Sequence, residues 1–135
     1  MQSSIQTAPV SRKRLWAGRI LSALPSLFLL LDGVAKVVRP APVVEGTVKL
    51  GYPETVIVPL GIVLLTCTLL YVIPRTSFLG AILLTGYLGG AVATHVRVGD
   101  PLFTHVLFPI YLGVLIWGGL YLRDDRLRAL IPLRS

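Results

Sequence analysis

Six ionisable side chains lie in or beside apolar segments of the chain, where charged groups are unusual. They are Asp32, Lys36, Glu54, His95, Arg97 and His105. Carboxylate, ammonium, imidazole and guanidinium groups can bind a polar ligand or carry protons. Charges next to lipid are costly, and they usually face the interior of a helix bundle or a water-filled cavity. These residues therefore predict a polar site or vestibule, provided that the fold brings them together.

Three of the charged residues follow helical spacing. Asp32, Lys36 and Arg39 stand at positions i, i+4 and i+7, so on a continuous helix they would share one face. An ion pair between Asp32 and Lys36 would lower the cost of placing either group near lipid. Two interpretations stay open: a binding or proton-handling site, or a self-neutralised pair beside basic side chains that extend to the membrane surface.

Two histidines are candidates for metal or haem ligands. His95 and His105 are separated by a turn that contains Gly99 and Pro101, so their side chains could approach each other. Imidazole binds several metals and can ligate haem in pairs. Two histidines are nevertheless a small ligand set, and we predict no metal ion here but a hydrogen-bonding or protonatable histidine at the membrane surface. Cys67 is the single cysteine, which excludes a disulfide within the chain.

A stripe of small residues indicates where helices pack. Gly86, Gly90 and Thr94 recur every four residues, the spacing that lets membrane helices approach closely. We expect this seam to pack within the chain, with dimerisation as the alternative. Tyr87, Ala91 and His95 lie on the neighbouring face.

The elements that must position these residues are predicted to be membrane helices. Hydrophobic residues make up 54% of the 135 positions and charged residues 14%, with a mean hydropathy of +0.78. Four apolar segments, 15–38, 54–73, 78–96 and 102–122, are each near the ~20 residues that cross a bilayer. A short interfacial helix is expected at 43–50. The sequence thus predicts an all-α, membrane-embedded four-helix bundle, comprising an N-terminal tail (1–14), the helical domain (15–123) and a C-terminal tail (124–135).

The distribution of positive charge predicts the topology. Although the net charge is +7, the basic residues stand at the ends of apolar segments, which argues against nucleic acid as a partner. Nine of the 13 would lie on one side of the membrane: Arg12, Lys13, Arg14, Arg19, Arg75, Arg123, Arg126, Arg128 and Arg134. The other side would hold Lys36, Arg39, Lys49 and Arg97. We therefore expect a multi-pass protein of the cell (inner or plasma) membrane with both termini cytoplasmic, a polar outer end and an almost purely apolar inner half.

Four motifs resemble one known family. They are Leu31-Asp32-Gly33-Val34-Ala35-Lys36, Leu50-Gly51-Tyr52-Pro53, Ile73-Pro74-Arg75-Thr76 and the run from Gly86 to Pro101. Together they resemble the DoxX-like family of small four-helix bacterial membrane proteins, over about residues 24–123. The resemblance implies the fold, and it singles out Lys36, Gly86, Gly90, His95 and Arg97 without a catalytic role for any of them. Relatives are linked to thiosulfate-to-quinone electron transfer and to membrane redox or thiol-stress complexes.

Three functions are consistent with these features. The first is an accessory or quinone-interacting subunit of a membrane redox system, with a quinone as the cofactor and a redox enzyme or a second copy of the chain as partner. The second is a non-catalytic membrane anchor or assembly protein, and the third is a small transporter component. No nucleophile elbow, P-loop or dinucleotide fingerprint occurs in the sequence, and whether the protein is an enzyme stays open.

Overall fold

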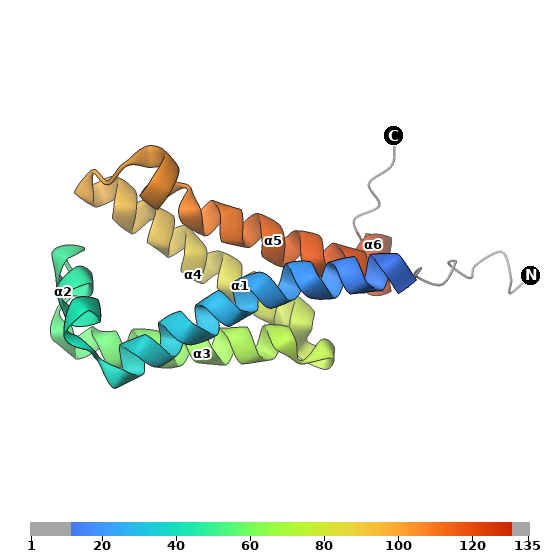
Figure 1. Ribbon diagram of the computed structural model, residues 1–135, viewed down its shortest axis with the longest axis horizontal. Helices are drawn as coiled ribbons and strands as arrows, with labels where there is room; N and C mark the ends of the chain where they lie inside the picture. Colours follow the sequence, from blue (N-terminus) through green and yellow to red (C-terminus); the bar gives the residue numbers. More distant parts are fainter. Residues whose placement is uncertain (1–11, 131–135) are drawn as a thin grey trace, which may run out of the picture.

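The protein is a bundle of long helices. A computed structural model describes residues 12–130, and no strand occurs within that range. The long helices are α1 (Arg12–Val38), α3 (Ile57–Val72), α4 (Ser77–Val98) and α5 (Phe108–Arg123). Two short helices, α2 (Ala41–Lys49) and α6 (Asp125–Leu130), lie at opposite ends (Figure 1). The predicted all-α fold is confirmed.

Four helical segments are long and apolar enough to cross a membrane. They are Arg12–Val38, Glu54–Val72, Pro74–Val98 and Leu102–Arg123. At most a third of each apolar window is buried inside the bundle, and large side chains such as Leu24, Leu31 and Val114 are mostly exposed. An apolar surface of this extent is stable in lipid and not in water. The structure therefore has the form of an integral membrane protein.

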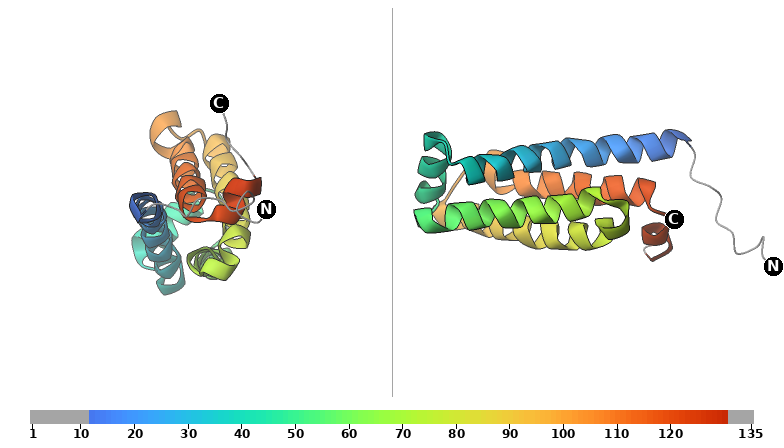
Figure 2. Two further views of the ribbon diagram at one scale, coloured as in Figure 1. Left: turned by 90° about the vertical axis from the view of Figure 1, so that its right-hand side faces the viewer. Right: turned by 90° about the horizontal axis from the view of Figure 1, so that it is seen from below.

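The long helices form a ring in which each packs against two neighbours. Helix α1 contacts α3 and α5, and α4 contacts the same two helices from the other side. The end-on view shows this ring (Figure 2). We refer to the end of the bundle that carries α2 and residues 99–107 as the α2 end. The opposite end, with α6 and the turn Pro74–Thr76, is the α6 end.

Two glycine contacts set the path of α1 across the bundle. At the α6 end, a Cβ added to Gly18 would lie 2.8 Å from the carbonyl oxygen of Gly119 in α5. Toward the α2 end, a Cβ added to Gly61 in α3 would lie 2.9 Å from the carbonyl oxygen of Gly33. Helix α1 thus leaves α5 and approaches α3 along its length (Figure 1). This crossing separates α1 from α5 at the α2 end and from α3 at the α6 end.

The connections refine the predicted helix bounds. The short helix expected at 43–50 is α2. Helix α4 continues through Arg97 and Val98, beyond the predicted segment 78–96, and it ends where Gly99 adopts a φ of +76°. The fourth apolar segment begins with a π-helical turn, Leu102–Val106, before regular α-helix starts at Phe108.

The α6 end contains a polar network, so the predicted apolar inner half is wrong. The buried Tyr71 hydroxyl donates to the carbonyl of Ile116 at 2.6 Å and contacts the Ser22 hydroxyl at 3.0 Å. The Arg123 guanidinium donates to Ser22 Oγ at 2.9 Å and lies 5.0 Å from the centre of the Tyr71 ring. The small hydroxyl residues of this network lie inside apolar segments, so their sequence context does not predict it.

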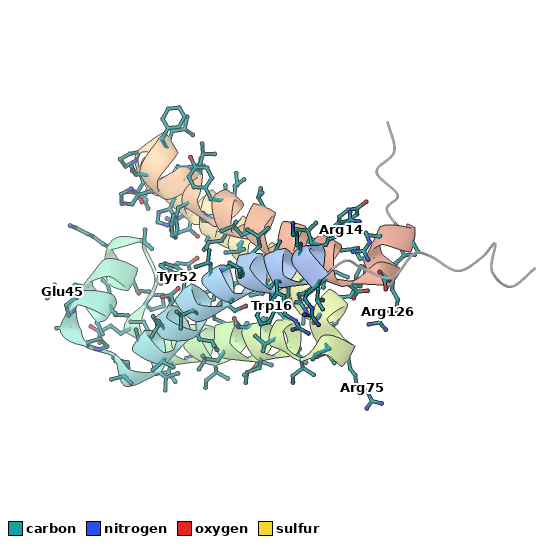
Figure 3. All side chains as sticks on the ribbon, turned by 45° about the vertical axis from the view of Figure 1, so that its right-hand side comes forward. Arg14, Trp16, Glu45, Tyr52, Arg75 and Arg126 are labelled. Carbon is teal, nitrogen blue, oxygen red and sulfur yellow. The ribbon has the colours of Figure 1, made fainter. Side chains whose placement is uncertain are left out.

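The predicted tails are partly helical. Helix α1 includes Arg12–Arg14, which had been assigned to the N-terminal tail, and α6 lies within the predicted C-terminal tail. The rest of both tails, 1–11 and 131–135, including Arg134 of the charge count, lies outside the described residues. Among labelled side chains, Arg14, Arg75 and Arg126 stand at the α6 end and Glu45 at the α2 end (Figure 3).

Candidate ligand-binding site

A cavity of about 420 Å³ occupies the α2 end, where α1 diverges from α5. We call it the vestibule. Its polar lining residues are Asp32, Lys36, Thr47, Tyr52, Tyr87, Thr94 and His95. Its apolar walls include Phe28, Leu29, Leu60, Leu88, Phe108 and Leu112. Three of the six ionisable residues singled out in the sequence, Asp32, Lys36 and His95, therefore line one space.

The Asp32–Lys36 ion pair forms as its spacing predicted. Lys36 Nζ lies 2.6 Å from Asp32 Oδ1, and the side chains of Lys36 and Asp32 are 15% and 34% exposed. Lys36 fits because Gly61 faces it: a Cβ on Gly61 would lie 2.8 Å from Lys36 Cβ. The pair thus holds an ammonium group in a fixed place at the vestibule wall.

Arg39 does not share a helical face with this pair. Helix α1 ends at Val38, and Arg39 adopts a left-handed φ of +62°. Its guanidinium lies 3.5 Å from Glu54 Oε2, and both side chains are exposed. Arg39 and Glu54 therefore form a surface pair outside the vestibule, because the predicted i+7 position assumed a helix that continues.

His95 is the histidine that reaches the vestibule. The turn at Gly99 brings Asp100 back, so that Asp100 Oδ2 lies 2.6 Å from His95 Nδ1. The ring of His105 lies 5.8 Å from that of His95, as the short turn predicted, but His105 does not line the vestibule. Within residues 12–130 there is no group of three or more histidine, cysteine or acidic residues that could hold a metal.

Arg97 supports the vestibule from outside. Its guanidinium donates to the carbonyl of Leu50 and lies against Gly51, where a Cβ would be 2.8 Å from Arg97 NH2. Gly51 also has a φ of +97°, a conformation that glycine tolerates. Arg97 thus fixes the loop that carries Tyr52 into the interior (Figure 3).

The glycine stripe of α4 is not a packing seam within the described chain. A Cβ added to Gly86 or Gly90 would meet no atom within 4 Å. The expectation of intramolecular packing there is wrong, because the bundle places both glycines at the vestibule, where they leave space. Thr94 instead donates to the Gly90 carbonyl at 2.8 Å and accepts from the Tyr52 hydroxyl at 2.7 Å.

Comparison with known proteins identifies the family. The sequence profile described as the DoxX-like family matches residues 20–119. The chain belongs to the DoxX-like family. No curated protein and no solved structure shows significant similarity to it. The matched range contains every vestibule residue of this DoxX-like protein, but it stops short of Arg123 and α6.

The family match and the four apolar spans establish this DoxX-like chain as an integral membrane protein. Of the residues that the resemblance singled out, four line the vestibule: Lys36, Gly86, Gly90 and His95. Arg97, the fifth, holds the adjacent loop. Family membership by itself assigns none of them a reaction.

Sequence reasoning missed two tyrosines of the vestibule in this DoxX-like protein. Tyr52 comes from the loop after α2, and Tyr87 is one helical turn before Ala91 and two before His95 on α4. The Tyr87 hydroxyl makes no hydrogen bond with any residue of the range 12–130. The shared face of Tyr87 and His95 was visible from their spacing. Only the divergence of α1, a tertiary feature, reveals that this face borders a cavity.

Proposed function

We propose that this DoxX-like protein binds the head group of a membrane quinone in the vestibule, as an accessory or quinone-interacting subunit of a membrane redox system. One observation carries the proposal: Lys36, Tyr87 and His95 line the same cavity of about 420 Å³, whose other walls are mostly apolar. Sites for small ligands are commonly ~300–1,000 Å³, apolar, and furnished with a few convergent polar groups.

The polar groups match the chemistry of a quinone head group. Quinone oxygens accept hydrogen bonds, and two residues of the vestibule, Lys36 and Tyr87, have unused donors. Lys36 carries three N–H bonds, of which one is directed to Asp32. Among the described residues the Tyr87 hydroxyl is unused. Because Asp100 binds His95 at Nδ1, Nε2 of the neutral imidazole is free as an acceptor, which suits the hydroxyl of a reduced quinone. Phe28 and Phe108 meet edge to face, with ring centres 5.1 Å apart, and provide an aromatic wall.

The distribution of arginines between the two ends of the bundle also supports the proposal. The positive-inside rule favours a cytoplasmic α6 end, which carries most of the arginines, in the cell membrane. The vestibule would then lie near the opposite surface. The apolar tail of the quinone would extend into lipid between the helices, and a redox enzyme would exchange electrons with the head group.

Filling part of the vestibule is expected to weaken quinone binding strongly. Gly90 lines the vestibule, and a Cβ added to it would meet no atom within 4 Å, so Gly90→Leu adds bulk at the cavity wall without a backbone clash. We expect the affinity for decylubiquinone, titrated into the protein in lipid nanodiscs, to fall at least tenfold, because ligand and side chain would occupy one volume. Tyr87→Phe, which removes one donor, should weaken binding by about fivefold.

Gly118→Leu is the matched control. Gly118 is equally free of neighbours within 4 Å, and it does not line the vestibule. Its quinone affinity should equal that of the unmodified protein. Wild-type protein that binds no quinone, or equal affinities for Gly90→Leu and Gly118→Leu, would reject the proposed site.

A second candidate function is a membrane anchor or assembly protein. It is favoured by a shallow apolar groove between α4 and α5, lined by Val92, Gly113 and Val114 among others. A Cβ on Gly113 would meet no atom within 4 Å, so the helix backbone is accessible there to a partner helix. Protein that purifies in complex with another membrane protein but has no affinity for quinone would favour this function.

A further inference from the structure

A second cavity lies at the α6 end, far from the vestibule. It occupies about 540 Å³ where α1 diverges from α3. Its polar lining residues are Arg19, Ser22, Ser26, Tyr71 and Arg123, and aliphatic residues such as Leu27 and Leu30 provide much of the remainder. No acidic residue of the range 12–130 lines it. The cavity thus combines two arginines, three hydroxyl-bearing residues and an apolar wall.

Arg123 has no carboxylate partner within residues 12–130. Its hydrogen bonds go to neutral acceptors: Ser22 Oγ at 2.9 Å, Ser77 Oγ at 3.4 Å and the carbonyl of Tyr71 at 3.4 Å. The adjacent Asp124 is directed to Arg126, at 3.6 Å. A partly buried cation is stabilised by an anion, and these contacts use three of the five N–H bonds of the guanidinium.

Arg19 adds a second cation with the same lack of a counter-charge. It is exposed at the cavity, its guanidinium lies 5.3 Å from the centre of the Trp16 ring, and it makes no salt bridge with a residue of the described range. Tryptophan and arginine together are typical of the level at which lipid head groups begin.

From these groups we infer that the cavity at the α6 end binds the phosphate of an anionic phospholipid. The unused N–H bonds of Arg123, the Arg19 guanidinium and the Ser26 hydroxyl would bind the phosphate oxygens, since guanidinium pairs well with phosphate. One acyl chain would lie against Leu27 and Leu30. This site is independent of quinone binding. An anionic lipid of the adjacent leaflet would occupy the crevice between α1 and α3.

Titration with phosphatidylglycerol tests this inference. The full chain in phosphatidylcholine nanodiscs or neutral detergent is titrated with phosphatidylglycerol, and bound lipid is counted by native mass spectrometry. We expect wild type to retain phosphatidylglycerol in preference to phosphatidylcholine. Arg19→Gln should weaken binding about fivefold, and Arg123→Gln about tenfold or more. Arg19→Gln keeps the test decisive if Arg123→Gln does not fold.

Arg75→Gln is the control, because Arg75 is an exposed arginine of the same end that does not line the cavity. Its lipid affinity should be unchanged. Inorganic phosphate at millimolar concentration is added as a competitor: displacement of the lipid would show that the site recognises the anion alone, and no displacement that it needs the acyl chain. Equal losses of phosphatidylglycerol affinity in all three variants would overturn the inference. Equal retention of phosphatidylglycerol and phosphatidylcholine by wild type would overturn it as well.

Discussion

Replacing Gly80 with alanine is expected to destabilise the protein by about 3 kcal/mol, the upper part of the range for overpacking a tight contact. A Cβ at position 80 would lie 2.2 Å from the backbone nitrogen of Tyr71 and 2.5 Å from its Cα. The backbone there has little freedom to shift, because the Ser77 hydroxyl binds the Tyr71 carbonyl at 2.7 Å. Helices α3 and α4 would have to separate at their junction.

Chemical unfolding in detergent micelles measures this change, with Gly118→Ala as the control. Gly118 is also a helical glycine, but an added Cβ would meet nothing within 4 Å. Alanine is the better helix former by ~1 kcal/mol, so Gly118→Ala should leave stability unchanged or slightly raised. If both variants unfold at the same denaturant concentration, the close α3–α4 contact does not exist in solution.

Removing the Lys36 ammonium is expected to cost about 2 kcal/mol, somewhat less than for a fully buried pair. Lys36→Met would leave the Asp32 carboxylate in the vestibule without the partner that now lies 2.6 Å away. The double variant Asp32→Asn/Lys36→Met removes both charges, and it should recover most of the loss. Unfolding of the two single variants and the double variant, without quinone, gives the coupling energy.

Arg39→Met provides the reference for an exposed pair. Arg39 and Glu54 are 3.5 Å apart with side chains 42% and 62% exposed, so this substitution should change stability by less than about 0.5 kcal/mol. A coupling energy near zero for Asp32 and Lys36 would contradict the account. It would mean that water screens the vestibule pair as fully as the surface pair.

Local sequence features predicted much of this fold. Apolar segments of near-bilayer length gave the four long helices, and the spacing of Asp32 and Lys36 gave their ion pair. Both depend on residues within one helix. The approach of His95 and His105 was likewise predictable, because a turn of a few residues joins their helices.

Contacts between distant residues could not be predicted in the same way. The stripe of Gly86 and Gly90 has the spacing of a packing seam, yet close helix contacts occur elsewhere: at Gly80 with Tyr71, at Gly18 with Gly119 and at Gly33 with Gly61. A glycine that permits close packing and one that borders a cavity look alike in the sequence. The path of α1 decides between them, and that path results from packing of the whole bundle.

The same difference between local features and contacts of distant residues applies to the candidate site. Its charged residues could be selected from the sequence, but Arg97 proved to hold a loop, and Glu54 to pair at the surface. Tyr52 enters the vestibule from a loop whose course depends on Arg97. The network around Arg123 joins Ser22 and Arg123, which are about a hundred positions apart in the chain. No local sequence pattern predicts such a contact.

Photoaffinity mapping shows directly whether a quinone occupies the vestibule. The protein in nanodiscs is irradiated with a photoreactive benzoquinone analogue, digested, and analysed by mass spectrometry, with unlabelled decylubiquinone as competitor. We expect competable labels on vestibule residues, foremost Lys36, Tyr87 and His95, and their loss in Gly90→Leu. Labels confined to the α4–α5 groove or the α6 end, or labels that excess quinone does not suppress, would contradict the assignment of the vestibule as a quinone site.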